Sequence, residues 1–150
     1  MKQSIILFAA LATLTQPAWS SASDPIYRCG PHAGHAYFLS GLFVNEANAG
    51  WHKDGTSEGW VLLWDYDGDA KNMDLVFKTA DGRVRSTKDQ GGYIVPLSHS
   101  KDETTILVNY SGEVTEVWQF DRPSKTYQMT SMKYGSSLIR KAAAFAGFCE

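Results

Sequence analysis

The stretch 104–134 constrains the fold of this chain more than any other part of the sequence. It holds three runs rich in β-branched and aromatic residues, TTILVNY, EVTEVWQFD and TYQMTSMKY, separated by two short turn signals. Gly112 in the first turn can take the positive φ of a tight hairpin, and Pro123 in the second presets φ for a turn. This order predicts a three-stranded antiparallel meander. In its middle run, alternate residues share one face: Val114, Glu116, Trp118 and Phe120.

The rest of the chain shows the same pattern of short apolar runs between turn residues. Roughly eight short strands with Gly and Pro between them predict an all-β fold, a small single-domain antiparallel sandwich or barrel. Segment 45–59 has no clear period and predicts a long loop. In 138–149 the alanines favour a short C-terminal helix, whereas a period of two favours a strand. We expect a strand that returns beside the first one.

The first twenty residues have the layout of a secretory signal peptide. Lys2 is basic, residues 5–14 are apolar, and small residues around Ser20 suit a signal peptidase. We expect cleavage after Ser20, which leaves one domain, 21–150, exported to the periplasm or the exterior of a bacterium. The apolar run is too short to cross a bilayer, so we expect no membrane span once the signal is removed.

The two cysteines, Cys29 and Cys149, predict a disulfide that ties both ends of the domain together. An even number of cysteines in an exported protein favours a bridge. Closing a loop of 120 residues removes roughly 4–5 kcal/mol of unfolded-state entropy in the chain-entropy model. The alternative is a Cys29 nucleophile assisted by His32 or His35, which we consider less consistent with an exported pair.

The charge of the chain argues against two classes of partner. Its formal net charge is −2, and the loss of Lys2 with the signal makes it one unit more negative. Nucleic acids and anionic membranes both require a basic face. We therefore expect no nucleic-acid partner, and the sequence does not indicate an oligomeric state.

Aromatic and polar residues in the expected loops are the candidates for recognition. Loops on a rigid β scaffold often carry binding residues, and Tyr and Trp are favoured at interfaces. Trp51 lies in the polar segment 45–59, where we expect it to be exposed. The predicted binding residues are Trp51, His52 and Asp54, together with Tyr66 in the turn that follows 60–65.

Asp65, Asp67 and Asp69 are the residues that most resemble a metal site. Alternate carboxylates on a loop can converge on calcium. The EF-hand pattern nevertheless fails, because counting from Asp65 puts Gly68 fourth and Val76 twelfth, where the motif needs glycine sixth and glutamate twelfth. The histidines supply no convincing zinc set either. We therefore expect no metal and no cofactor, and we interpret the aspartates as turn residues.

The sequence favours a non-catalytic binding or inhibitor-type module for a protein or glycan. No recognised catalytic motif is present, although paired carboxylates such as Glu113 and Glu116 leave open a small hydrolase. A structural envelope component is a third hypothesis. In being exported, compact, β-rich and disulfide-tied, the chain is similar to the small periplasmic inhibitors of C-type lysozyme. The serine- and tyrosine-containing inhibitory loop of that family is not recognisable in this sequence, so the resemblance is one of architecture.

Overall fold

The structure, a computed structural model, describes residues 24–65, 72–79 and 81–150. These residues form ten β-strands and a short 3-10 helix, which confirms the predicted all-β fold. The first five strands are Tyr27–Phe38 (β1), Gly50–Gly55 (β2), Trp60–Asp65 (β3), Met73–Lys78 (β4) and Val84–Ser86 (β5). The other five are Gly92–His99 (β6), Glu103–Tyr110 (β7), Val114–Asp121 (β8), Thr126–Lys133 (β9) and Lys141–Cys149 (β10), and the 3-10 helix is Glu46–Asn48 (η1).

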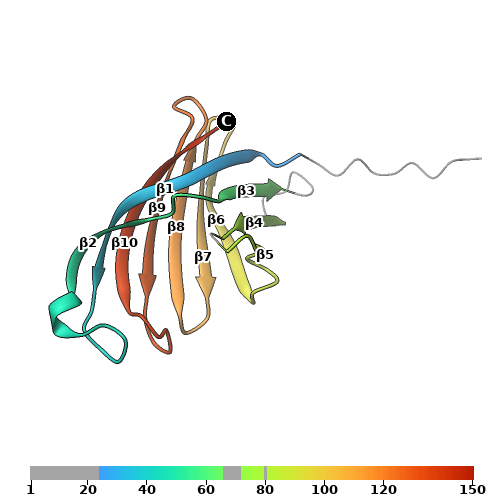
Figure 1. Ribbon diagram of the computed structural model, residues 1–150. Coiled ribbons are helices and arrows are strands. Elements are labelled where there is room, and N and C mark those ends of the chain that lie inside the picture. The colour runs from blue at the N-terminus through green and yellow to red at the C-terminus, as the bar shows by residue number, and fades with distance from the viewer. Residues whose placement is uncertain (1–23, 66–71, 80) are drawn as a thin grey trace, which may run out of the picture.

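All ten strands belong to one antiparallel sheet, which curls into a half-barrel (Figure 1). The order is β5-β4-β3-β1-β10-β9-β8-β7-β6, and β2 pairs with β1 beside this path. Within the described residues no ladder joins the edge strands β5 and β6, which are linked by the connection 87–91. The strand count exceeds the predicted eight, and a single curled sheet rules out the sandwich alternative. The described residues contain no helix with the length and apolarity needed to cross a membrane.

Strand β1 holds the half-barrel together. It pairs with β10 along one edge, while its other edge pairs first with β3 and then with β2. Cys29 lies directly opposite Cys149 in the β1–β10 ladder, and the two form a disulfide. The predicted bridge is confirmed. The expected C-terminal strand is confirmed as well, so the helical alternative for 138–149 was wrong.

The prediction of a loop over 45–59 was wrong for residues 50–55. Gly50–Gly55 is strand β2, which pairs with the second half of β1 from Phe38↔Gly50 to Ala33↔Gly55. The segment has weak strand propensity of its own. Pairing with the otherwise open edge of β1 overrides that propensity, because strand formation depends more on neighbours than on local composition.

The disulfide end of the interior is a packed apolar core. Four aromatic rings stack there with centroids 5.0–6.0 Å apart. They belong to Tyr27, Trp118, Phe120 and Tyr127. Leu63, Ile106 and Val108 are fully buried beside them. The predicted shared face of β8 is therefore its interior face, since Trp118 and Phe120 belong to this core.

Candidate functional site

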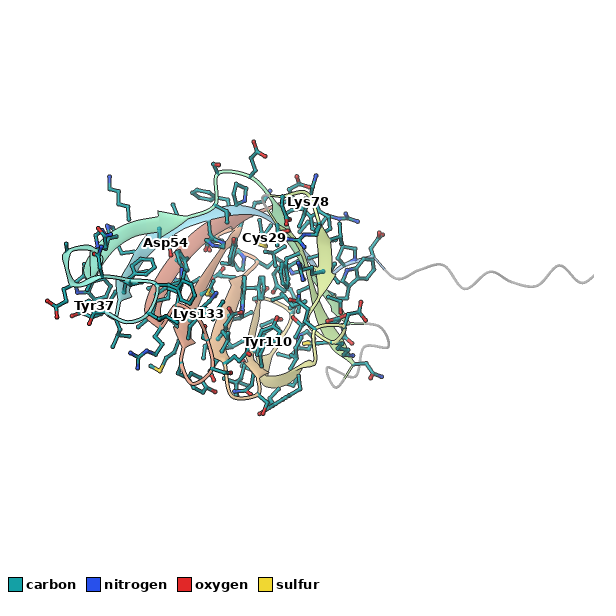
Figure 2. All side chains as sticks on the ribbon, turned by 60° about the horizontal axis from the view of Figure 1, so that its bottom comes forward. Cys29, Tyr37, Asp54, Lys78, Tyr110 and Lys133 are labelled. Atoms are coloured by element: carbon teal, nitrogen blue, oxygen red, sulfur yellow. A yellow bond between two sulfur atoms is a disulfide. The ribbon has the colours of Figure 1, made fainter. Side chains whose placement is uncertain are left out.

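Beside the packed core, part of the interior of the half-barrel is hollow. The hollow is a cavity of about 610 Å³, a volume typical of small-molecule sites. Strands β7, β8 and β9 form one wall, and β1, β3, β4 and the β2–β3 connection form the other. Figure 2 shows Lys78, Tyr110 and Lys133 on three sides of this hollow. The cavity follows from the curl of the sheet, because a half-barrel can enclose a ligand between its walls.

Strand β8 places a carboxylate in the cavity wall. Its alternation points Val114, Glu116 and Trp118 inward, and all three line the cavity. The Trp118 indole N–H donates to the Glu116 carboxylate at 2.9 Å, and the Ser131 hydroxyl donates to it at 3.4 Å. Glu116 lies opposite Ser131 in the β8–β9 ladder, so the sheet itself fixes this contact.

The surroundings of Glu116 favour its protonated form. Burial raises the pKa of the Glu116 carboxyl, and this effect outweighs the hydrogen bonds from Trp118 and Ser131 and the nearby cations Lys133 and Lys141. A carboxyl with a perturbed pKa in a cavity wall is typical of a functional site. The same burial means that the ionised Glu116 carboxylate destabilises the fold.

His32 lies in the opposite wall, and its tautomer follows from its partner. The Tyr127 hydroxyl donates its one proton to the Gly30 carbonyl at 3.0 Å, so it must accept from His32 Nδ1 at 3.2 Å. Burial, together with the charge of Lys141, lowers the pKa of His32 despite the opposing effect of Asp54. The neutral ring therefore carries its proton on Nδ1 and has a free acceptor at Nε2.

Gly147 makes room for the Tyr127 ring that orients His32. It lies opposite both His32 and Tyr127 in the ladders of β10. A Cβ at Gly147 would lie 2.4 Å from the Tyr127 ring and 2.8 Å from the Pro31 carbonyl. Any other residue at this position would displace the ring, so Gly147 acts indirectly on the orientation of His32.

An ion pair crosses β1 next to the cavity. Asp54 on β2 and Lys141 on β10 belong to the strands on either side of β1 and form an ion pair across it. The Lys141 ammonium also lies 5.2 Å from the centre of the Phe38 ring. Burial alone would raise the pKa of Asp54, but the Lys141 hydrogen bond and charge lower it. The charges of both residues act on His32 as well.

No family model, curated protein or solved structure matches this chain. The geometry of the half-barrel is therefore the basis for a functional proposal.

The predicted binding residues do not form one site. Because they lie on a strand, they alternate between its faces. Trp51 is on the outer face, 68% exposed as expected, with its ring 5.5 Å from that of Tyr37. His52 and Asp54 face inward, where His52 contacts Phe38 and Asp54 pairs with Lys141. A binding role for these residues stays a prediction.

Several of the predicted residues lie outside the described part of the chain. Tyr66, Asp67 and Asp69 are among them, and Asp65 is buried at the end of β3. Within 24–65, 72–79 and 81–150, no three His, Cys, Asp or Glu residues are grouped to hold a metal ion. The calcium hypothesis involves undescribed residues and stays untested.

Sequence reasoning missed the cavity as a site, although one signal for it was present. Glu116 interrupts an otherwise apolar face of β8, between Val114 and Trp118. A charged residue at an interior position of a strand indicates either a buried network or a functional wall. His32 had been weighed only as a metal ligand or as the partner of a nucleophile. Its pairing with Tyr127 depends on strand register, which the sequence does not specify.

Proposed function

We propose that this protein is a non-catalytic binding module that takes part of a glycan or a protein into the half-barrel cavity. The observation that carries the proposal is the cavity of about 610 Å³ with Glu116 and His32 in facing walls. Ligand sites combine apolar walls with a few placed polar groups, as this cavity does. The disulfide and the leader-like first twenty residues support a place of action in the periplasm or outside the cell.

Trp118, Met129 and Phe77 supply the apolar wall of the proposed site. Trp118 is held by its ring stack and by its hydrogen bond to Glu116, so its position is fixed before a ligand arrives. A preformed wall reduces the ordering cost of binding. The same rigidity favours a binding module over a purely structural component, whose interior would gain more from complete filling.

Native mass spectrometry tests this proposal on protein purified from the periplasm of an expressing bacterium. We expect a non-covalent adduct on the wild type. It should be lost in Val114→Phe, which fills the cavity, and in Ser111→Trp, which lies on the turn at its edge. Trp51→Ala is the matched control, because Trp51 lies on the outer face, and it should keep the adduct. An adduct lost only in Trp51→Ala would contradict the cavity as the site.

A small hydrolase is the second candidate, and one observation favours it. Glu58, Glu113 and Glu116 all line the cavity, and burial raises the pKa of Glu116, as a general acid requires. A chromogenic glycoside panel separates the two functions. If the protein is a hydrolase, Glu116→Gln abolishes turnover while it keeps binding. If no glycoside is cleaved, only the binding function remains.

A further inference from the structure

We propose that the cavity takes an uncharged, hydroxyl-rich ligand with apolar faces, which is the chemistry of a short saccharide. This inference rests on the proposed binding function and specifies its ligand. Four features of the cavity carry it: ionisable groups of both signs, acceptors in facing walls, hydroxyl and amide groups, and aromatic surface.

The ionisable groups of the lining disfavour a charged ligand of either sign. Glu58, Glu113 and Glu116 line the same cavity as Lys78 and Lys133. A cationic ligand drawn to Glu116 would meet Lys133, whose charge already acts on that carboxyl together with Lys141. An anionic ligand drawn to the lysines would meet three carboxylates. Specificity against charged ligands is achieved by placing such unfavourable contacts in a site.

The inner walls offer hydrogen-bond acceptors. Glu116 contributes a carboxyl group from β8, whose oxygens already accept from Trp118 and Ser131 and keep further lone pairs. His32 contributes Nε2 from β1, since its Nδ1 proton is donated to Tyr127. Among the described residues, Nε2 of His32 has no hydrogen-bond partner. A ligand that supplies donors can pair with Nε2 of His32 and with the remaining lone pairs of Glu116. Hydroxyl groups supply donors without charge.

The edge of the cavity offers groups that both donate and accept. Thr56, Thr79 and Ser111 contribute hydroxyls, and Gln90 contributes a side-chain amide. A hydroxyl can donate one hydrogen bond and accept two, which matches the hydroxyls of a sugar in either role. Such a mixed edge suits a ligand with many equivalent polar groups better than one with a single charged head.

Aromatic rings complete the match. Trp60, Phe77, Tyr110 and Trp118 all line the cavity. Rings bury large apolar areas, and their electron-rich faces attract the weakly positive C–H groups of a sugar ring. A peptide could also use the aromatic wall. Its charged side chains and termini would meet the unfavourable contacts described above, so a peptide is an outcome for the test to detect.

A ligand titration of the wild-type protein, followed by two-dimensional nitrogen–proton correlation NMR spectra, tests the ligand class. The neutral probes are maltotriose, cellotriose and the trimer of N-acetylglucosamine. The matched charged probes are the trimers of glucosamine and of galacturonate, and an uncharged and a charged tripeptide test the peptide outcome. We expect at least one neutral trimer to shift resonances of cavity residues, including the Trp118 indole, and its charged analogue to bind about tenfold more weakly or worse.

Variants identify the atoms that hold the saccharide. Glu116→Leu and His32→Phe each remove the hydrogen-bonding group and should weaken the neutral trimer about tenfold or more, as expected when a hydrogen bond to a placed acceptor is lost. Glu46→Gln, on the exposed helix η1, is the control and should leave binding unchanged. The wild-type titration needs no variant, so a variant that fails to fold does not remove the test.

Each outcome separates this inference from the function on which it rests. Tighter binding of a charged trimer or a tripeptide at the cavity overturns the saccharide class and leaves the binding function standing. The same holds if no saccharide binds while the adduct that depends on Val114 persists. If neither a probe nor such an adduct reaches the cavity, both the ligand class and the proposed function are wrong.

Discussion

The two ends of the half-barrel interior are built by the same strands and differ in kind. At the disulfide end, Leu63, Phe120 and Tyr127 are fully buried. At the other end the inward positions hold charged side chains, including the Asp54–Lys141 pair. The difference teaches that packed and charged interior positions lie along the same strands, so the proposed function would separate stability from binding within a strand.

Strand β8 shows this division within a few residues. Phe120 belongs to the core, Trp118 belongs to the core and also lines the cavity, and Glu116 and Val114 line the cavity. Strand β10 repeats it, with Cys149 in the core and Lys141 in the ion pair. A substitution at the core end should therefore act on stability, and one at the open end should act mainly on binding and pH response.

The largest expected effect on the free energy of unfolding comes from removing the disulfide at the packed end of the interior. The Cys29→Ser/Cys149→Ser double variant should lose about 4–5 kcal/mol of unfolding free energy, because the unfolded chain regains the freedom of a 120-residue loop. Urea denaturation measures the loss, and the wild type reduced with dithiothreitol is the control. A loss below about 1 kcal/mol would mean that pairing of β1 with β10 suffices without the bridge.

A smaller effect is expected from the ion pair at the open end. Lys141→Met leaves Asp54 partly buried without its cation and should cost about 1–3 kcal/mol at neutral pH. Lys141 lowers the pKa of Asp54, so this stabilisation is present above the ordinary value of 3.8 and is lost as the pH falls through the lowered pKa. Urea unfolding at pH 7 and pH 3 should show the cost shrinking in acid.

The Asp54→Asn/Lys141→Met double variant is the matched control for the ion pair. It removes the unpaired charge and should recover part of the loss seen in Lys141→Met. A double variant that is less stable than Lys141→Met alone would contradict an electrostatic role for the pair. It would point instead to a stabilising contact of Asp54 that does not need Lys141, such as the hydrogen bond that its carboxylate accepts from the Gly55 N–H.

The smallest expected effect is the change in the free energy of unfolding caused by Glu116→Gln. Burial raises the pKa of this carboxyl, so its contribution to stability is fully present below the ordinary value of 4.5 and is lost as the pH rises through the raised pKa. Glu116→Gln should therefore match the wild type near pH 4 and exceed its stability at pH 7.5 by on the order of 1 kcal/mol. Urea unfolding at the two pH values measures both, and a Glu116→Gln variant that is less stable at pH 7.5 would contradict the expected cost of this carboxyl.

The sequence predicted those parts of the fold that local signals determine. The alternation in 104–134 and the turns at Gly112 and Pro123 specify strands β7, β8 and β9, and two cysteines in a β-rich chain specify the link between β1 and β10. Strand β2 could not be predicted in this way. Its only reason to be extended is the free edge of β1, which is a property of the assembled sheet.

The cavity was beyond sequence reasoning for a related reason. The sequence grouped Glu116 with Val114, Trp118 and Phe120 on one face of its strand without indicating that this face is the interior one, and the wall that contains His32 comes from a distant segment. The register that brings Tyr127 to His32 depends on β10 lying between β1 and β9. The side on which each predicted binding residue lies was also beyond sequence reasoning, because strand alternation sends Trp51 outward and Asp54 inward.

The position of β10 between β1 and β9 has a consequence for folding during synthesis. While the polypeptide is being synthesised, Tyr27 and Cys29 emerge early, yet the strand that covers them emerges more than a hundred residues later. Ladders between such remote segments form slowly, because the entropy cost of closing a long loop comes before the favourable contacts form. A nascent chain that ends before residue 141 lacks β10, so the edges of β1 and β9 that pair with it stay open. Such open edges and the uncovered apolar core promote aggregation, so we expect this chain to need a chaperone.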